Sequence, residues 1–505
     1  MWSGFFQKIA RIPLHPFLFA AYPILALYAQ NVADVSTLEL LRPLPAAFLL
    51  TGILWFFLYL IFRSWDRAAT ATSLLVLAFF PLWGTVVKNA LVWLSDTTTL
   101  KIRYLFLLYC GIVTLFLYMT AWRSTKSERL TRLGNGVSFL LIFLALTQTG
   151  VNLVRCGYLR SPKKTETPVF VQPTNITPNK DYPDIYFIVL DAYARADMLE
   201  QYYGINNEPF LNALRERGFF IANQSHTIYT DTILSLPACL NMDYIENIFQ
   251  DNQIKRNEIE ALCQVGKVHH LLKEQGYLLA GFDSEFRFSQ PGEVFDRVMR
   301  FQKPWWVPTE FENLLLDFTP LLRVLRYAGV DFSHEMWRRH ILYMLEHLHV
   351  PASESPERPV FVQAHIVAPH APFVFRSDGT AREPSGTFTL NPSADPGQSL
   401  ELYVRLYAEQ VLGLNSHVLP AIDRILALPN RRAIIALVSD HGGPKMDHLY
   451  PPGAFYNFIA LRLPGVPHEE LPDDMNLVDL FPIVFQKALG ITVPLPKIPA
   501  TRLQN

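Results

Sequence analysis

Five apolar segments within the first 154 residues constrain this chain more than any other feature of its sequence. Each is close to the ~20 residues that a helix needs to cross the hydrocarbon core of a bilayer. A cleaved signal peptide would not be followed at once by further segments of this kind, so we interpret the first as an uncleaved anchor. The sequence therefore predicts an α-helical membrane domain of five transmembrane helices over residues 1–154. The segments are Leu14–Gln30, Pro45–Phe62, Thr72–Leu94, Tyr104–Trp122 and Gly134–Val154.

Basic residues beside these segments predict how the helices are oriented. Eight lie on the side of the amino terminus and three in the opposite loops. Because cytoplasmic loops carry the excess of Lys and Arg, the amino terminus is expected in the cytoplasm. Five crossings then place everything after Val154 in the periplasm or outside the cell, on an integral protein of the inner or plasma membrane. Lys88, inside the third segment, is expected to extend towards the lipid headgroups. The eight basic residues on the side of the amino terminus are Lys8, Arg11, Arg63, Arg67, Arg123, Lys126, Arg129 and Arg132. The three in the opposite loops are Arg42, Lys101 and Arg103.

The rest of the chain has the pattern of a globular domain. Residues 155–182 are rich in Pro, Lys, Thr and Asn without periodicity, which is typical of a linker. Over residues 183–505, short apolar runs alternate with helical patterns, which predicts an α/β domain with a largely parallel central sheet between helices. A net charge of −1 gives no indication of nucleic acid as a partner. The expected strands are Ile185–Leu190, Tyr277–Phe282, Val360–Val367 and Ala433–Val438, and the expected helices include Glu208–Arg217 and Leu402–Leu428.

Two further features of this part leave alternatives open. The stretch from Trp305 to Leu348 looks helical, and it fits either a helical subdomain or a segment packed against the bilayer surface. Cys239 and Cys263 fit either a disulfide in an oxidising compartment or two buried thiols.

Metal-ligating side chains follow three of the expected strands. The first strand ends at Asp191, the third delivers His365 and His370, and the fourth ends at Asp440 and His441. In open α/β sheets ligands gather at the carboxyl ends of the strands, so these side chains are expected at one edge. Carboxylate and imidazole ligands together suit zinc or manganese. Taken singly, Asp191 also fits a helix cap, and each histidine fits a core or surface position without a role.

A hydroxyl beside such a metal is the expected nucleophile. The segment YTDTILSLPACLNMDY offers Thr230, Thr232 and Ser235. Coordination lowers the pKa of a bound hydroxyl and produces an alkoxide without a dedicated base. The same residues also fit the start of a helix, and the two interpretations are compatible, because a helix amino terminus favours a phosphoryl group.

These motifs, taken in order along the chain, resemble those of the alkaline-phosphatase superfamily. Within it they are most similar to the sulfatase-like branch of lipoteichoic acid synthases and lipid A phosphoethanolamine transferases, whose members have five transmembrane helices, a linker and an extracytoplasmic catalytic domain. Thr232-Ile-Leu-Ser235-Leu-Pro237 matches the T-x-x-S-x-P form of the transferases, in which the threonine is the nucleophile. Asp191 matches their first metal-binding acid, which is commonly Glu.

The resemblance extends to the histidines. Asp440 and His441 match the metal-binding Asp-His pair of the family, and His365 and His370 match the H-x-x-x-x-H spacing of the transferases. His448 is similar to a further metal-binding histidine, although its spacing differs. One departure concerns the sulfatases, because Cys239 stands where their C/S-x-P-x-R motif has Arg.

The resemblance implies a metal-dependent enzyme with one or two zinc or manganese ions. Thr232 would carry a phospholipid headgroup, of phosphoethanolamine or phosphoglycerol type, from a membrane lipid to a glycan or lipid of the cell envelope. Hydrolysis by the same site, as a phosphodiesterase, phosphatase or sulfatase-like hydrolase, is a second expectation. A non-catalytic role in the assembly of envelope polysaccharide is a third.

Overall fold

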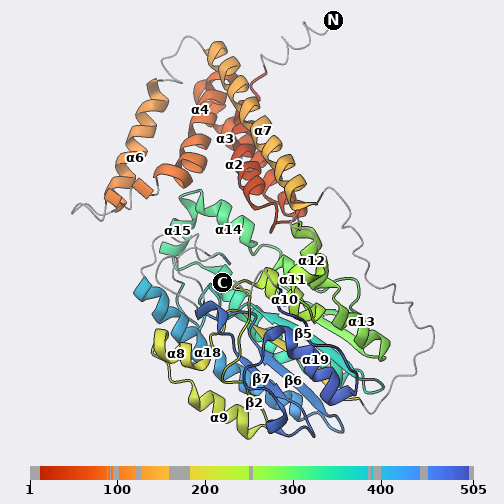
Figure 1. Ribbon diagram of the computed structural model, residues 1–505. Helices are drawn as coiled ribbons and strands as arrows, with labels where there is room; N and C mark the ends of the chain where they lie inside the picture. The colour runs from red at the N-terminus through yellow and green to blue at the C-terminus, as the bar shows by residue number, and fades with distance from the viewer. Residues whose placement is uncertain are drawn as a thin grey trace, which may run out of the picture. The chain divides into compact units, whose positions relative to one another are not determined.

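The computed structural model describes residues 12–87, 89–90, 93–94, 102–119, 127–158, 182–249, 254–384, 388–390, 400–443 and 453–499 (Figure 1). The chain forms two compact units. The helical unit comprises Met1–Leu159 and Pro308–Asp331, and the sheet unit comprises Arg160–Val307 and Phe332–Asn505. Lys88 and most of the expected linker lie outside the described residues.

Helices occupy all five apolar segments of the helical unit. Among the described residues, three helical stretches are long and apolar enough to cross a membrane, namely Thr37–Phe62, Trp65–Val87 and Glu128–Cys156. The other two helices, α2 and α6, are shorter, with 17 and 16 residues. The count of five membrane-spanning helices is therefore not established by length and composition. The elements are α2 (His15–Asn31), η1 (Thr37–Leu41), α3 (Pro43–Phe62), α4 (Trp65–Leu77), η2 (Ala78–Val87), α6 (Ile102–Leu117), α7 (Ser127–Cys156), α14 (Glu310–Asp317) and α15 (Leu321–Tyr327).

A buried polar cluster joins three of these helices. The Asn135 side chain of α7 accepts hydrogen bonds from the backbone N–H groups of Leu14 (3.1 Å) and His15 (2.9 Å), at the start of α2. Its amide donates to the carbonyl of Ile12 at 2.8 Å. His15 Nδ1 lies 2.6 Å from the hydroxyl of Ser73 on α4. Because helices in lipid gain little from the hydrophobic effect, such polar contacts help to hold α2, α4 and α7 together.

The sheet unit contains seven strands in the order β2-β7-β6-β1-β5-β3-β4. The five strands from β6 to β4 pair in parallel, as the sequence predicts. At the other edge, β7 is antiparallel to both β6 and β2, so the sheet is mixed. The strands are β1 (Asp184–Leu190), β2 (Phe220–Ile221), β3 (Leu278–Phe282), β4 (Arg297–Met299), β5 (Val360–Ile366), β6 (Ala433–Val438) and β7 (Ile459–Arg462). The four strands expected from the sequence are confirmed to within one residue at each end.

Helices cover both faces of this sheet (Figure 1). Along β1, Tyr186 and Ile188 pack into one core, whereas Ile185 and Phe187 pack into the other. This burial of alternate residues on both faces explains why the strand is apolar throughout. Cys239 and Cys263 are free thiols within the second core, which agrees with the interpretation of two buried cysteines. Burial raises the pKa of both thiols.

The two helical layers come from different parts of the chain. Residues of α8 (Ala196–Tyr203), α9 (Glu208–Glu216), α16 (Phe332–His347) and α18 (Leu400–Leu426) pack on one face. Residues of α10 (Thr232–Asn241), α12 (Arg256–Gln264), α13 (Lys267–Glu274) and α19 (Leu480–Val484) pack on the other. The remaining elements are α11 (Ile245–Ile248), α17 (Val350–Ser353), η4 (Arg287–Ser289), η6 (Gly453–Phe455), η7 (His468–Glu470), η8 (Leu477–Asp479) and η9 (Phe485–Leu489).

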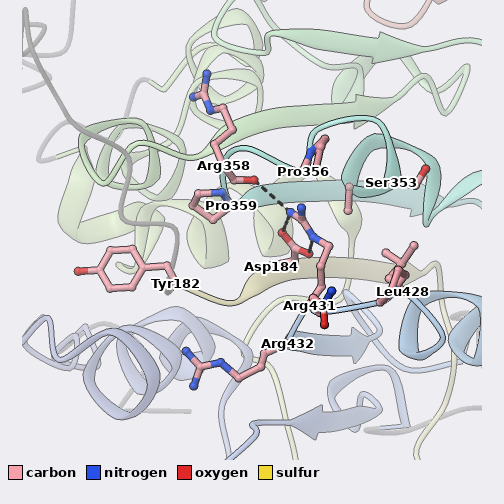
Figure 2. Close-up of a pocket in the computed structure, with 12 residues that line it drawn as sticks. Tyr182, Asp184, Ser353, Pro356, Arg358, Pro359, Leu428, Arg431 and Arg432 are labelled. Carbon is pink, nitrogen blue, oxygen red and sulfur yellow. Dashed lines mark hydrogen bonds and ion pairs between the residues drawn. The ribbon is translucent and has the colours of Figure 1, made fainter.

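A pocket of about 810 Å³ lies at the amino-terminal edge of the sheet, and an ion pair fixes the strands there (Figure 2). Asp184, the first residue of β1, accepts two hydrogen bonds from the guanidinium of Arg431, just before β6. The same carboxylate accepts from the N–H of Val360 at 2.9 Å, at the start of β5. Arg431 also donates to the carbonyls of Ser355 and Arg358, both at 3.0 Å. These contacts hold the starts of β1, β5 and β6 in register, and so they also determine how the opposite ends of the strands meet.

The Asn135 cluster predicts a measurable contribution to the stability of the helical unit. Replacing Asn135 with Ala removes three hydrogen bonds and leaves two N–H groups of α2 without this acceptor. We expect a loss of about 1–2 kcal/mol, seen as a lower thermal midpoint of the purified protein in detergent. Thr147→Ala is the control, because this exposed hydroxyl of α7 bonds only to a carbonyl of its own helix. Equal midpoints for the two variants would show that the cluster is not stabilising.

Candidate active site

The carboxyl ends of three adjacent strands bring the predicted site residues together. β1 lies between β5 and β6, and Val189 pairs with His365 on one side and with Val438 on the other. Asp191 follows β1 directly, while Asp440 and His441 follow β6. Parallel pairing in this register places the three strand ends at one edge of the sheet, as the sequence predicts.

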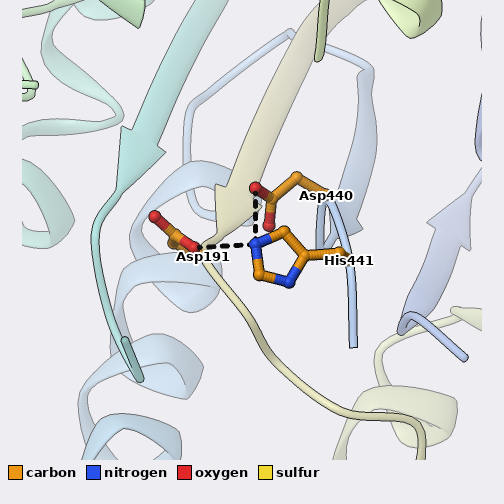
Figure 3. Close-up of side chains that lie close together, drawn as sticks. All are labelled: Asp191, Asp440 and His441. Carbon is orange, nitrogen blue, oxygen red and sulfur yellow. Dashed lines mark ion pairs between the residues drawn. The ribbon is translucent and has the colours of Figure 1, made fainter. Parts of the chain in front are cut away.

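Asp191, Asp440 and His441 form a buried cluster that fits a metal ion (Figure 3). One ligand atom from each residue lies within 4.8 Å of those of the other two. His441 Nε2 is 3.6 Å from Asp191 Oδ1 and 3.5 Å from Asp440 Oδ2. Asp191 Oδ1 is buried and has no hydrogen-bond partner among the residues that the structure describes. A buried carboxylate oxygen is costly to leave without a donor or a cation, and this donor set suits a divalent ion.

Thr232 lies directly beside this cluster. It is the first residue of α10, which Asp231 caps by accepting a hydrogen bond from the N–H of Leu234 at 3.0 Å. The Thr232 hydroxyl donates to Asp440 Oδ2 at 2.6 Å, and its side chain is 8% exposed. The Ser235 hydroxyl instead donates to the carbonyl of Asp231 at 2.7 Å, within the same helical turn. Of these two hydroxyls, Thr232 is the one that contacts the carboxylate cluster.

The other two histidines predicted for the site, His365 and His370, also adjoin Asp191. His365 Nε2 is 3.4 Å from Asp191 Oδ2, in ion-pair range but without hydrogen-bond geometry. His370 donates its backbone N–H to the carbonyl of Asp191 at 3.1 Å, while its Nδ1 lies 2.7 Å from the carbonyl of Ala371. The structure therefore brings Asp191, Thr232, His365, Asp440 and His441 together, with His370 adjoining through its backbone. His448 lies outside the described residues.

Electrostatic interactions within the cluster shift two pKa values. Burial alone would raise the pKa of Asp191, but His370, His365 and His441 outweigh it and hold this pKa well below its usual range. Burial would lower the pKa of His441, but the carboxylates of Asp440 and Asp191 outweigh it and raise this pKa above its ordinary value. Asp191 is therefore an ionised carboxylate at neutral pH, as a metal ligand must be.

A chain of two serines supports His365 and was not expected from the sequence. The Ser289 hydroxyl lies 2.7 Å from His365 Nδ1 and 2.9 Å from the Ser284 hydroxyl. All three side chains are buried. With Nδ1 held in this way, Nε2 is directed at Asp191, which is how outer hydrogen bonds orient a reactive histidine. Both serines follow β3 in the sequence FDSEFRFS, and nothing in the spacing of that segment indicates a contact with β5.

The backbone after Asp191 is strained, and a tyrosine on α18 stabilises it. Ala192 has a left-handed φ of 61°, which is uncommon for a residue with a Cβ. Its N–H donates to Asp440 Oδ1 at 3.1 Å, and its carbonyl accepts from the Tyr407 hydroxyl at 2.6 Å. The N–H of Ala194 donates to the same hydroxyl at 3.0 Å. These contacts fix the turn that joins Asp191 to Asp440, and strain of this kind clusters at functional sites.

Comparisons with known proteins give structural similarity only. No family model matches the sequence, and no curated protein matches it. The fold is similar to the C-terminal periplasmic domain of EcEptC from Escherichia coli in complex with Zn, with 14% identity over 62% of this chain and 84% of that chain and a TM-score of 0.39. It is similar to the soluble domain of lipooligosaccharide phosphoethanolamine transferase A from Neisseria meningitidis, with 13% identity over 61% and 89% of the chains and a TM-score of 0.38. It is also similar to phosphonate monoester hydrolase SpPMH from Silicibacter pomeroyi, with 17% identity over 62% and 74% and a TM-score of 0.42.

The carboxylate cluster predicts metal binding that depends on Asp191. We expect Asp191→Asn, which keeps the size of the side chain but removes its charge, to lower zinc or manganese affinity by about tenfold or more. Metal content after equilibrium dialysis measures this loss, and metal-induced thermal stabilisation provides a second readout. Asp197→Asn is the matched control, because this exposed carboxylate pairs with Arg195 at 2.7 Å, outside the cluster. Equal metal binding by both variants would contradict the assignment.

Proposed function

We propose that the chain is a metal-dependent enzyme that transfers a phosphoryl-type group through Thr232. The observation that carries this proposal is the 2.6 Å hydrogen bond from the Thr232 hydroxyl to Asp440, a member of the carboxylate–histidine cluster. A buried hydroxyl, two carboxylates and a histidine at one point form the set needed to activate a nucleophile beside a cation. The superfamily resemblance of the sequence supports the same conclusion.

Each residue of the candidate site has a separate role in the proposed reaction. Asp191, Asp440 and His441 would hold one divalent ion, zinc or manganese, and His448 is a further candidate for that ion or for a second one. When bound, the ion lowers the pKa of an adjacent hydroxyl and offsets negative charge on phosphoryl oxygens. Asp440 orients the Thr232 oxygen, and the amino terminus of α10 presents backbone N–H groups and a favourable dipole to an anionic group.

The proposed reaction has two displacement steps at phosphorus. In the first, a bond forms from Thr232 Oγ1 to phosphorus while its proton passes to Asp440, and the bond to the diacylglycerol oxygen breaks, leaving the headgroup phosphate on the threonine. His365 or His370 supplies the proton to the leaving oxygen. In the second, an acceptor hydroxyl attacks phosphorus and returns a proton to that histidine, and the Thr232 oxygen leaves with the proton held by Asp440. The two steps restore the enzyme and transfer the whole headgroup phosphate.

We infer a membrane phospholipid as donor and a glycan or lipid of the cell envelope as acceptor. The helices long and apolar enough to cross a membrane support this choice, because anchorage raises the effective concentration of a lipid substrate at the site. A headgroup of phosphoethanolamine or phosphoglycerol type fits the motif T-x-x-S-x-P at Thr232. Five crossings with the amino terminus in the cytoplasm would place the site in the periplasm or outside the cell.

Hydrolysis is the second candidate function, because water in place of the acceptor hydroxyl completes the same second step. The site geometry is equally suited to both outcomes. Incubation with a labelled phospholipid, with and without an envelope extract, separates them, since a transferase forms a new labelled product only with the extract. A non-catalytic role in envelope assembly would instead give no turnover and no bound metal.

Substitution of the nucleophile tests the proposal. Thr232→Ala should lower headgroup release from labelled phospholipid by about a thousandfold or more, as expected for loss of a nucleophile. Metal content should stay near that of the native protein, because the carboxylates and His441 are unchanged. Thr230→Ala is the matched control, since it removes a hydroxyl two residues away and should retain activity.

Mass spectrometry gives an independent reading of the same step. The native protein mixed briefly with the donor lipid should carry a headgroup phosphate on Thr232, and Thr232→Ala should not. Full activity of Thr232→Ala, or an adduct at Thr230 instead, would overturn the assignment.

A further inference from the structure

One segment of the chain leaves the sheet unit and joins the helical unit. Residues Pro308–Asp331 belong with the amino-terminal helices, although Val307 before them and Phe332 after them belong to the sheet unit. Trp306 and Phe332 bracket the segment, and their rings meet edge to face at 4.9 Å. The segment therefore leaves and re-enters the sheet unit at one place. We call Pro308–Asp331 the docking insert.

The first helix of the docking insert, α14, packs on the end of α2. Phe311 and Leu315 are buried in a cluster with Ile24, Tyr28 and other apolar side chains of α2 and the turn after it. The rings of Tyr28 and Phe311 meet edge to face at 6.5 Å. Glu312 forms an ion pair of 3.0 Å with Arg42, which immediately precedes α3. α14 is thus held where the chain turns from α2 into α3, a predicted boundary of the bilayer (Figure 1).

The docking insert also contacts the end of the stretch Trp65–Val87, at η2. A Cβ built on Gly84 of η2 would lie 2.5 Å from the Phe318 ring and 2.7 Å from the Phe318 Cα. Only glycine permits so close an approach of the two backbones. The insert therefore spans from the start of α3 to η2, two elements that belong to different candidate membrane spans.

The second helix of the docking insert, α15, exposes apolar side chains at this boundary. Leu322 is buried, whereas Leu321 and Val324, three residues apart and so on one side of the helix, are 49% and 58% exposed. Leu38 and Leu41 of η1, the link between α2 and α3, are likewise exposed. Large apolar side chains exposed on elements that adjoin candidate membrane spans are typical of interfacial segments.

We propose that the exposed side of α15 rests in the headgroup region of the bilayer, so that the docking insert anchors the chain to the membrane surface. The occupant of this surface is lipid, because the insert is packed against elements that themselves lead into candidate membrane spans. The chain passes between the two units at 159–160, 307–308 and 331–332, so the insert adds two covalent connections to that of the linker. This anchorage does not depend on the chemistry proposed for Thr232.

Site-directed spin labelling of the full chain in bilayers of phosphatidylethanolamine and phosphatidylglycerol tests this proposal. The test label is placed by Val324→Cys, with Phe57→Cys on the exposed side of α3 as the lipid reference and Glu200→Cys on α8 as the water reference. Cys110→Ser and Cys156→Ser remove the two accessible native thiols, and the buried Cys239 and Cys263 do not react. Collision rates with oxygen, which partitions into lipid, and with a water-soluble nickel complex report the surroundings of each label.

We expect the ratio of oxygen collisions to nickel-complex collisions at 324 to lie between the ratios at 57 and 200, as for a side chain at headgroup depth. Equal values at 324 and 200 would place α15 in water and overturn the proposal. An immobile label at 324 that neither reagent reaches would show a protein partner instead, and would overturn it as well.

Discussion

The main physical constraint on the site is the electrostatic free energy needed to bury the carboxylates of Asp191 and Asp440 beside one another. Both are almost fully buried, and within the described part of the chain Asp191 Oδ1 has no donor. His441, whose pKa these carboxylates raise, offsets part of this cost, and a divalent cation would offset the rest. The Thr232 hydroxyl then acquires its proposed reactivity from its position, because it bonds to a carboxylate of the same cluster.

The architecture of the sheet creates this convergence from residues far apart in the chain. The Asp184–Arg431 ion pair fixes the starts of β1 and β6, and their parallel register carries that alignment to Asp191 and Asp440. Tyr407 then holds the strained turn at Ala192, whose N–H orients the Asp440 carboxylate. Substitutions at either end of these strands would therefore change how Asp191 and Asp440 are aligned at the site.

Sequence patterns predicted the parts of this structure that depend on local chemistry. Apolar runs located β1, β3, β5 and β6, and the polar residues after β1 and β6 indicated the carboxylate–histidine cluster. Thr232 was indicated by the separate segment YTDTILSLPACLNMDY. The strands β2, β4 and β7 were missed, because they have only two, three and four residues and leave little periodic signal. Ser289 and Tyr407 were missed for another reason. Their roles arise from tertiary contacts with His365 and Ala192, and single serines and tyrosines occur throughout the chain.

The central claim is that one cation binds between Asp191, Asp440 and His441 with Thr232 at its side. Anomalous diffraction from crystals of the zinc-loaded full-length protein, recorded on both sides of the zinc absorption edge, measures this directly. The account predicts an anomalous peak within bonding distance of ligand atoms from all three residues, with the Thr232 oxygen beside it. A peak bound elsewhere, or an ordered site at these residues without any peak, would contradict it.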